Sequence, residues 1–232
     1  MAEKALRSEI SSIAALGDPI RRSLYSFVVD QTEPVSRDMA ASGVAIARHV
    51  AKFHLDKLEE EGLLEAEYRR PTGKTGPGAG RPTKYYRRSP REISVSLPER
   101  HYDLAARLLA QAIITSQTGD LLVSAALEKS AASFGQIMAQ EVQGKLDGGS
   151  GKTNVAEAIS EVLSDHGYEP RKEEGRLVLA NCPFHSLAQE YTALICGINH
   201  NLLNALIDEL PAAFTANLEP APGRCCVTLN EI

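Results

Sequence analysis

The pattern of apolar and polar positions is most informative in residues 36–91, where two helices and a hairpin are expected. Over residues 48–61 apolar side chains recur at the spacing of one helix face, and the opposite face is basic. The inner face is assigned to Ala47, Ala51, His54, Leu55 and Leu58, and the outer face to Arg48, His49, Lys52 and Phe53. Residues 44–55 contain no acid, whereas Asp56 and residues 59–61 are acidic, so the charges oppose the helix dipole. This order favours an anionic partner at the start of the helix, such as the DNA major groove.

The flanking residues predict a helix, a turn, the basic helix and then a hairpin. Residues 37–41 form the short first helix behind a serine N-cap, and Ser42–Gly43 form the turn. Gly62 is expected to end the basic helix, and residues 63–68 and 84–87 to pair as strands. Residues 69–91 contain no acid. Their basic residues are Arg69, Arg70, Lys74, Arg81, Lys84, Arg87, Arg88 and Arg91. A long hairpin with only positive charge suits the phosphate backbone or the minor groove of DNA.

Residues 46–64, IARHVAKFHLDKLEEEGLL, resemble the recognition helix of ArsR-like winged helix-turn-helix regulators of bacteria. Residues 80–86, GRPTKYY, resemble the wing of the subgroup that includes SufR-type iron–sulfur sensors. A departure is Ala47, where such helices often open with a capping serine. The resemblance implies a homodimeric transcription regulator, expected to be a repressor, that binds a double-stranded DNA operator. The residues assigned to DNA contact are Arg48, His49, Lys52, Phe53, Arg69, Arg70, Lys74, Arg81, Lys84 and Arg87.

The charge of the chain changes this picture once it is divided. The whole chain has a net charge of −5, which by itself argues against a nucleic-acid binder. Residues 1–91 have a net charge of +4 and residues 92–232 a net charge of −9, as expected of a basic DNA-binding domain joined to an acidic partner domain. No apolar run reaches the ~18 residues of a membrane span, and Glu3, Lys4 and Arg7 interrupt any signal-peptide core. A cytoplasmic protein with reduced cysteines is therefore expected.

Two further helices are predicted before residues 36–91. They cover residues 4–16 and 20–30, with Asp18 as the N-cap of the second and Pro19 at its first position. Both have an apolar face, so they complete a small helical core for residues 1–91, the predicted DNA-binding domain.

Two long helices are predicted within residues 92–147. SLPE at residues 96–99 fits a capping box, so the first helix is expected from there to about residue 116, and the second over residues 121–145. Their alanine-rich faces have little to pack on inside one chain, which favours pairing with a second copy. The region is therefore interpreted as a dimerisation region, with a monomeric helical hairpin as the alternative.

Residues 153–232 are predicted to form a small α+β domain, so the chain as a whole is mainly α with two small sheets. DGGSGKT at residues 147–153 is a linker, because the glycine that a phosphate-binding loop needs earlier in the motif is replaced by Leu146. Helices are expected after Asn154 and over residues 184–191 and 197–210, and strands over residues 168–173, 176–180, 213–218 and 225–230. Helices are expected to cover one side of an antiparallel sheet.

All four cysteines lie in this last domain. Cys182 and Cys196 are expected at helix starts, where the dipole lowers a thiol pKa, and His185 follows Cys182 by three residues. Cys225 and Cys226 are neighbours on a predicted strand and face opposite sides, with Cys225 on the apolar side. The candidate metal ligands are Cys182, His185, Cys196, Cys225 and Cys226, with His200 as a spare candidate. Two or three cysteines with a histidine are ligands that zinc uses.

The segment NCPFHSLAQEYTALICG, residues 181–197, resembles the cysteine segment of SufR-type sensors, which implies an iron–sulfur cluster. Thirteen residues separate Cys182 from Cys196, and a further cysteine that such sensors carry between them is absent, which favours a mononuclear metal or a different cluster. A redox-reactive thiol pair and simply buried cysteines are the alternatives. The sequence thus predicts a regulator with a zinc or iron–sulfur site. A metal-handling or redox enzyme with an appended DNA-binding head is the alternative function.

Overall fold

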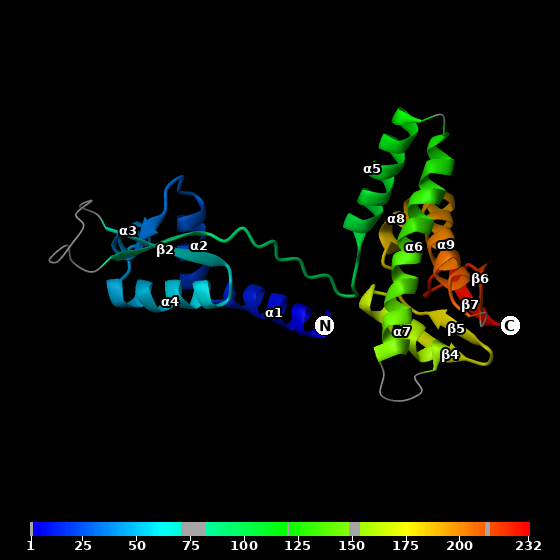
Figure 1. Cartoon of the computed structure of the whole chain (residues 1–232). Coiled ribbons are helices and arrows are strands. Elements are labelled where there is room, and N and C mark those ends of the chain that lie inside the picture. Colours follow the sequence, from blue (N-terminus) through cyan, green and yellow to red (C-terminus); the bar gives the residue numbers. More distant parts are fainter. Residues whose placement is uncertain (1, 71–81, 120, 149–153, 212–213) are drawn as a thin grey trace. The chain divides into compact units, whose positions relative to one another are not determined.

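The structure is a computed structural model that forms two compact units, Met1–Val95 and Ser96–Ile232 (Figure 1). It describes residues 2–70, 82–119, 121–148, 154–211 and 214–232. Each unit combines helices with an antiparallel sheet, which confirms the mixed α+β class and its mainly helical character. None of the helices in these described ranges combines the length and the apolar run needed to cross a bilayer.

The first unit has the predicted order of helices and hairpin. Its elements are α1 (Ala2–Ala15), α2 (Pro19–Val29), β1 (Val35–Ser36), α3 (Arg37–Gly43), α4 (Arg48–Glu60), β2 (Leu64–Arg69) and β3 (Thr83–Arg88). The sheet order is β1-β3-β2, and every pair is antiparallel. Strand β1 was not predicted from the sequence, because two residues are too few to show an alternating pattern. It pairs with Tyr85 and Tyr86 and brings the start of α3 to the hairpin.

Side-chain caps set the helix boundaries in this unit as expected. Asp18 accepts hydrogen bonds from the backbone N–H groups of Ile20 and Arg21, and Ser36 Oγ accepts one from Met39. Gly62, with a φ of 73°, follows the end of α4. The predicted inner face of α4 is confirmed except at one position, with Ala51, His54, Leu55 and Leu58 buried. Ala47 is exposed, because it is the N-cap of α4 and precedes the helical turns.

The turn between α3 and α4 lies later than predicted. Helix α3 runs through Gly43, and the chain turns at Val44 and at Ala45, whose φ is 55°. Gly43 has a different role, since a Cβ placed there would lie 2.1 Å from the Phe27 ring. The glycine therefore allows α2 and α3 to pack closely and does not provide the turn.

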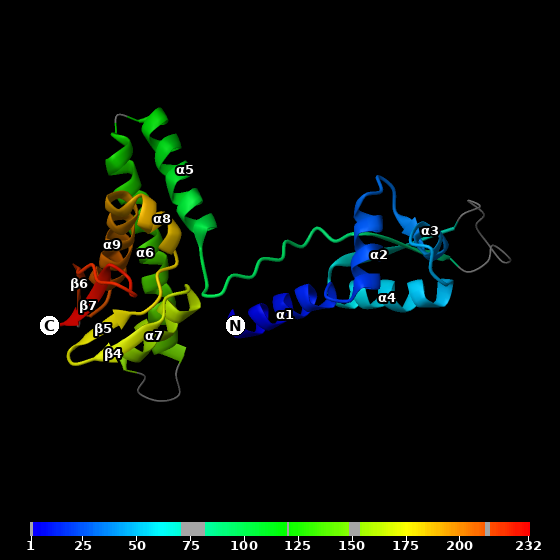
Figure 2. The same ribbon diagram turned by 180° about the vertical axis from the view of Figure 1, so that it is seen from behind.

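The second unit is a four-stranded sheet with helices packed on it (Figures 1 and 2). Its elements are α5 (Tyr102–Thr118), α6 (Val123–Gly148), α7 (Val155–Asp165), β4 (Pro170–Glu173), β5 (Arg176–Leu179), α8 (His185–Glu190), α9 (Thr192–Asp208), β6 (Phe214–Leu218) and β7 (Val227–Glu231). The strand order is β4-β5-β7-β6, all antiparallel. Helix α9 packs on β6 and β7, and α6 lies along α9.

The expectation that the two long helices find little to pack on is wrong for α6. One continuous core joins α5 and α6 to α7, α9 and the sheet, so the predicted ranges 92–147 and 153–232 share it. At Gly135, α6 and α9 come so close that an added Cβ would lie 2.1 Å from the Leu202 carbonyl oxygen. Small residues on α6 thus serve packing against α9 within the chain.

Helix α5 begins later than the predicted capping box. Ser96 Oγ donates to the carbonyl oxygen of Pro98 and caps no helix. The next residues bond instead to the connection between β5 and α8, where the His101 N–H donates to the Pro183 carbonyl oxygen. Because this backbone is used in a long-range contact, the first helical residue is Tyr102.

Candidate DNA-binding surface and cysteine cluster

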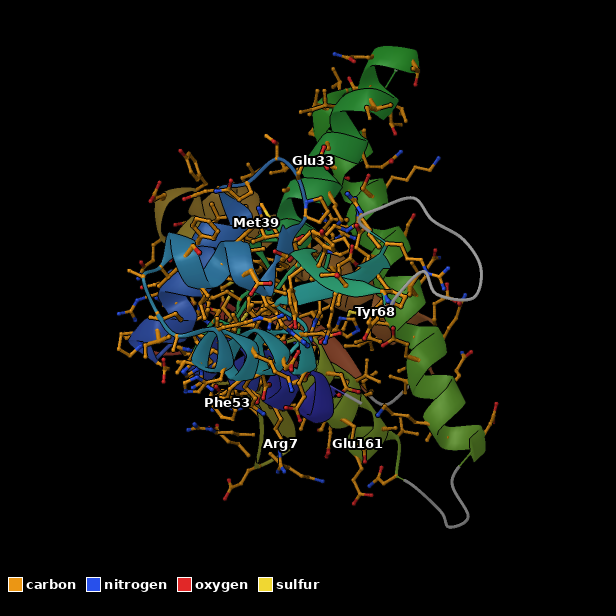
Figure 3. All side chains as sticks on the ribbon, turned by 90° about the vertical axis from the view of Figure 1, so that its left-hand side faces the viewer. Arg7, Glu33, Met39, Phe53, Tyr68 and Glu161 are labelled. Carbon is orange, nitrogen blue, oxygen red and sulfur yellow. The ribbon has the colours of Figure 1, made fainter. Side chains whose placement is uncertain are left out.

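The outer face of α4 is exposed, as the sequence predicts. Arg48, His49, Lys52 and Phe53 all reach solvent, and Phe53 is 66% exposed. Figure 3 labels Phe53 on α4 together with Met39 on α3 and Tyr68 on β2, which are also exposed. Between α4 and the β2–β3 hairpin lies a hollow of about 450 Å³. Its lining residues are Arg37, Asp38, Arg48, Lys52, Asp56, Tyr68, Pro82, Thr83 and Lys84.

Two cations near the start of α4, Arg48 and Lys52, are available to an anionic partner. Arg48 Nε lies 2.5 Å from Asp38 Oδ1 on α3, and both side chains are largely exposed. An ion pair in water contributes little, so Arg48 can exchange this carboxylate for a phosphate at small cost. Within the part of the chain that the structure describes, Lys52 makes no ion pair or side-chain hydrogen bond.

Strand β3 is fixed to α4 by a cluster of charged and hydroxyl groups around Asp56. The Asp56 carboxylate accepts hydrogen bonds from Tyr86 Oη at 2.6 Å, Lys84 Nζ at 2.9 Å and Arg37 Nη2 at 3.1 Å. Lys84 also pairs with Glu59 on α4. Burial opposes ionisation of Asp56, but hydrogen bonds from Tyr86 and Lys84 outweigh it and lower its pKa. The hairpin is therefore held in a defined position relative to α4.

This cluster changes the interpretation of Lys84, which the sequence assigns to DNA. The side chain is 13% exposed and points to the acids of α4. Burial lowers its pKa, yet the hydrogen bonds to Glu59 and Asp56 raise it overall, so the amine stays charged. In the structure Lys84 positions the hairpin, and direct contact with phosphate would require it to leave two carboxylates.

The other basic residues of the hairpin are partly neutralised by acids of β2. Arg69 pairs with Glu67, and Arg87 Nε lies 2.5 Å from Glu65 Oε1. Arg70 is exposed after the end of β2. The predicted contacts Lys74 and Arg81 lie outside the described residues. A count of charges that starts at Arg69 misses both acids. Antiparallel pairing brings Glu65 beside Arg87 of β3, and Glu67 lies two residues before Arg69 on β2.

The second unit brings all four cysteines into contact. Cys182 lies between β5 and α8, Cys196 lies in α9, and Cys225 and Cys226 precede β7. The side chains of Cys182 and Cys225 interact with one another, as do those of Cys225 and Cys226 and those of Cys226 and Cys196. Cys182, Cys196 and Cys225 are buried, Cys226 is half-buried, and all four are free thiols.

Two expectations about these residues are corrected by the structure. Cys196 does not open a helix, because α9 begins at Thr192, one turn earlier. Strand β7 begins at Val227, so Cys225 and Cys226 precede it, although the Cys225 N–H still donates to the Leu179 carbonyl oxygen. Cys225 nevertheless lies on the buried side with Val227, as predicted.

The two histidines considered as ligands lie elsewhere. His185 is exposed at the first position of α8. Its backbone N–H donates to the Cys182 carbonyl oxygen, but among the described residues no interaction joins its imidazole to a cysteine. The Nε2 atom of His200 lies 3.2 Å from the Ala216 carbonyl oxygen on β6. The cluster that the structure assembles thus consists of thiols, and neither imidazole belongs to it.

The thiol pKa values are raised, which is opposite to the expected effect of a helix start. The hydrogen bond to Cys225, together with burial, raises the pKa of Cys182. Burial raises the pKa of Cys196. For Cys225 the hydrogen bond to Cys182 lowers the pKa, but the bond to Cys226 and burial outweigh it and raise the value to about 12. Cys182, Cys196 and Cys225 are therefore neutral near pH 7 and would ionise only with a compensating cation.

The donor set fits a thiophilic metal in chemistry but is not preformed in geometry. Four sulfur atoms in contact are what zinc or an iron–sulfur cluster uses. Among the described residues, however, no three or more His, Cys, Asp or Glu side chains are arranged to hold a metal ion as they stand. The thiols bond to one another in a chain, so they would have to turn toward a common point to become ligands.

Residues that the sequence did not suggest connect this cluster to the start of α5. Arg100 Nη1 donates to the Cys182 carbonyl oxygen at 3.2 Å and also bonds to Asn181 Oδ1. Asn181 Nδ2 in turn donates to the carbonyl oxygens of Glu99 and Gly167. The backbone on both sides of Cys182 is thereby tied to the residues that precede α5.

Comparison with known proteins does not identify a family for the chain. No protein-family model matches it, and neither a curated protein nor a solved structure matches it.

Proposed function

We propose that this protein is a homodimeric, DNA-binding transcription regulator that acts as a repressor. The observation that carries the proposal is the exposed cationic start of α4 beside a hairpin that is fixed to the same helix. In this arrangement α4 enters the major groove with Arg48 and Lys52 toward base edges and phosphates. The hairpin runs along the neighbouring backbone, where exposed Arg70 supplies charge.

Pairing with a second copy is supported by apolar side chains that the chain leaves uncovered at the turn between α5 and α6. The exposed residues are Ile113, Ile114, Leu121, Leu122 and Val123. Soluble monomers seldom expose this many neighbouring large apolar side chains, and a symmetric partner would cover them. A two-fold dimer then predicts a roughly palindromic operator.

The cysteine cluster is proposed as the sensing site for a thiophilic metal, zinc or an iron–sulfur cluster. When bound, the metal would supply the positive charge that allows the buried thiols to ionise. Cys182 would carry the effect of metal binding beyond the site, because its carbonyl oxygen accepts a hydrogen bond from Arg100. A change in the position of Cys182 would therefore be transmitted to the residues that begin α5, and a coupling of about 1–3 kcal/mol is usual for such linked sites.

DNA binding is tested with an operator selected from random duplexes by the wild-type chain. Arg48→Ala and Lys52→Ala are each expected to weaken binding by about 1–3 kcal/mol and to relax sequence preference where the residue contacts a base edge. Lys129→Ala on α6 is the matched control for loss of one positive charge and should leave affinity unchanged. Unchanged binding by both α4 variants would contradict the proposal.

Metal sensing is tested by anaerobic purification, absorbance and metal analysis. Brown protein indicates an iron–sulfur cluster, and colourless protein with stoichiometric zinc indicates a zinc site. The double variant Cys182→Ser and Cys196→Ser is expected to lose the metal and to remain in one DNA-binding state. If it retains full metal content the ligands are wrong, and if it loses metal but binds operator with unchanged affinity the metal is structural.

A further inference from the structure

A buried amide on α9 is directed at the cysteine cluster. Asn199 is 1% exposed, and its Nδ2 atom donates a hydrogen bond of 3.0 Å to Cys225 Sγ. Its Oδ1 atom accepts a hydrogen bond from the hydroxyl of Tyr168, which is also buried. Around it, α9 contributes apolar side chains to the core, among them Ile195, Ile198, Leu202 and Leu203.

Packing alone does not explain an asparagine at this position. A buried amide that lacks good partners destabilises a protein by about 1–3 kcal/mol, and a leucine of similar size would suit the neighbouring core residues. A neutral thiol is a weak hydrogen-bond acceptor, so it returns little of this cost. A thiolate is a strong acceptor, because bonds in which one partner is charged are roughly twice as strong.

Cys225 is also distinguished from the other cysteines by its donor. Among the hydrogen bonds of the described residues, its sulfur receives the one side-chain N–H that is directed at a cysteine sulfur, from Asn199. A divalent metal held by four thiolates leaves an excess of negative charge in a buried site, and N–H groups directed at sulfur are the means to stabilise it.

We propose that Asn199, held in orientation by Tyr168, is a positioning residue that donates an N–H···S hydrogen bond to the metal-bound thiolate of Cys225. The inference rests on the metal-sensing part of the proposed function and deepens it. Of the neighbouring residues Cys225 and Cys226, it identifies Cys225 as the ligand, because the Asn199 amide stabilises its negative charge. The structure contains this hydrogen bond, so Asn199 also holds the Cys225 sulfur in a defined position.

The test compares metal affinity with the stability of the metal-free chain. In the double variant Asn199→Leu and Tyr168→Phe both polar partners are replaced together, so metal-free stability should stay the same or rise. Affinity for Co²⁺ and Zn²⁺, titrated anaerobically into the reduced full-length chain, should fall about 10- to 100-fold. Asn204→Ala on the same helix, whose amide bonds only to exposed Asp208 among the described residues, is the control and should change neither quantity.

Each outcome decides the question. A wild-type chain that binds metal and a folded double variant that binds it equally well overturn the role of Asn199 and leave the proposed sensor intact. A wild-type chain that takes up neither metal nor an iron–sulfur cluster overturns both. If the double variant does not fold, Tyr168→Phe alone decides, because it retains the ring and releases the amide. A loss of affinity in that variant supports the role, and unchanged affinity refutes it.

Discussion

Each of the two units contains one polar cluster next to its apolar core, and the two clusters are built in opposite ways. The cluster around Asp56 in the first unit is charged, partly exposed and complete, since its acids are matched by Arg37 and Lys84. The cluster around Cys225 in the second unit is largely buried and carries no matched charges, and its thiols interact with one another and with the Asn199 amide.

The difference shows what each cluster can contribute. Matched charges near water fix one element to another, here β3 to α4, and need no further component. Neutral thiols in a buried site are weak partners for one another, so the second cluster gains most from a cation that converts them to thiolates. In the proposed regulator the first unit is therefore expected to bind DNA without changing conformation, and the second unit is expected to change when a ligand binds.

The largest expected effect is stabilisation of the second unit by metal. Zinc at a thousandfold excess over its dissociation constant should raise the free energy of unfolding by about 4 kcal/mol, because only the folded site gathers the ligands. Hydrogen exchange of the full chain should slow in α9 and β7 and stay unchanged in α4. The variant Cys182→Ser with Cys196→Ser is the control. Equal protection of both units by zinc would show that the response to metal is not confined to the second unit.

A slightly smaller effect is expected from closing the contact between α6 and α9. Gly135→Ala would place a Cβ 2.1 Å from the Leu202 carbonyl oxygen, and backbone on α9 cannot move aside as a side chain does. We expect a loss of about 3 kcal/mol in denaturant unfolding of the second unit. At Gly144 on the same helix an added Cβ would meet no atom of the described residues within 4 Å, so Gly144→Ala should stabilise by about 0.5–1 kcal/mol. Similar results for both substitutions would show that α6 and α9 are not tightly packed.

Removal of one hydroxyl tests whether the charged cluster fixes the hairpin. Tyr86→Phe deletes a group that donates to Asp56 and accepts from Arg37 Nε at 3.0 Å, so the first unit should lose about 1–2 kcal/mol. Operator affinity should fall as well, although Tyr86 itself is buried. Tyr85→Phe is the matched control, since its hydroxyl bonds to none of the described residues. A hairpin held by its backbone alone would respond to neither change.

The smallest expected effect is an acid dependence confined to the first unit. The folded-state pKa of Asp56 lies below its ordinary value of 3.8, so the stabilisation is present above about pH 3.8 and is lost as pH falls through the folded value. Because Asp56 is about one-third exposed, the contribution should stay below about 1 kcal/mol. Denaturant unfolding of the wild type and of Asp56→Asn should therefore converge on acidification. A constant difference down to pH 2 would show that the charge of Asp56 is not responsible.

The sequence determined most of the first unit because its signals are local. The N-cap at Asp18, the serine cap of α3 and Gly62 after α4 act on backbone groups within a few residues. The 3.6-residue spacing that places Leu55 and Leu58 in the core is equally local. These features allowed the helices, the hairpin and the exposed cationic face to be predicted without any knowledge of the tertiary contacts.

Tertiary structure decided the features that depend on residues far apart in the chain. Lys84 lies 28 residues from Asp56, Asn199 lies 26 residues from Cys225, and Arg100 lies 81 residues from Asn181. No periodicity or cap connects such pairs, so the sequence assigned Lys84 to DNA and started α5 too early. It showed that four cysteines share one domain, but only folding brought their thiols together and buried Cys182, Cys196 and Cys225, and that burial contributes to the raised pKa of each of the three.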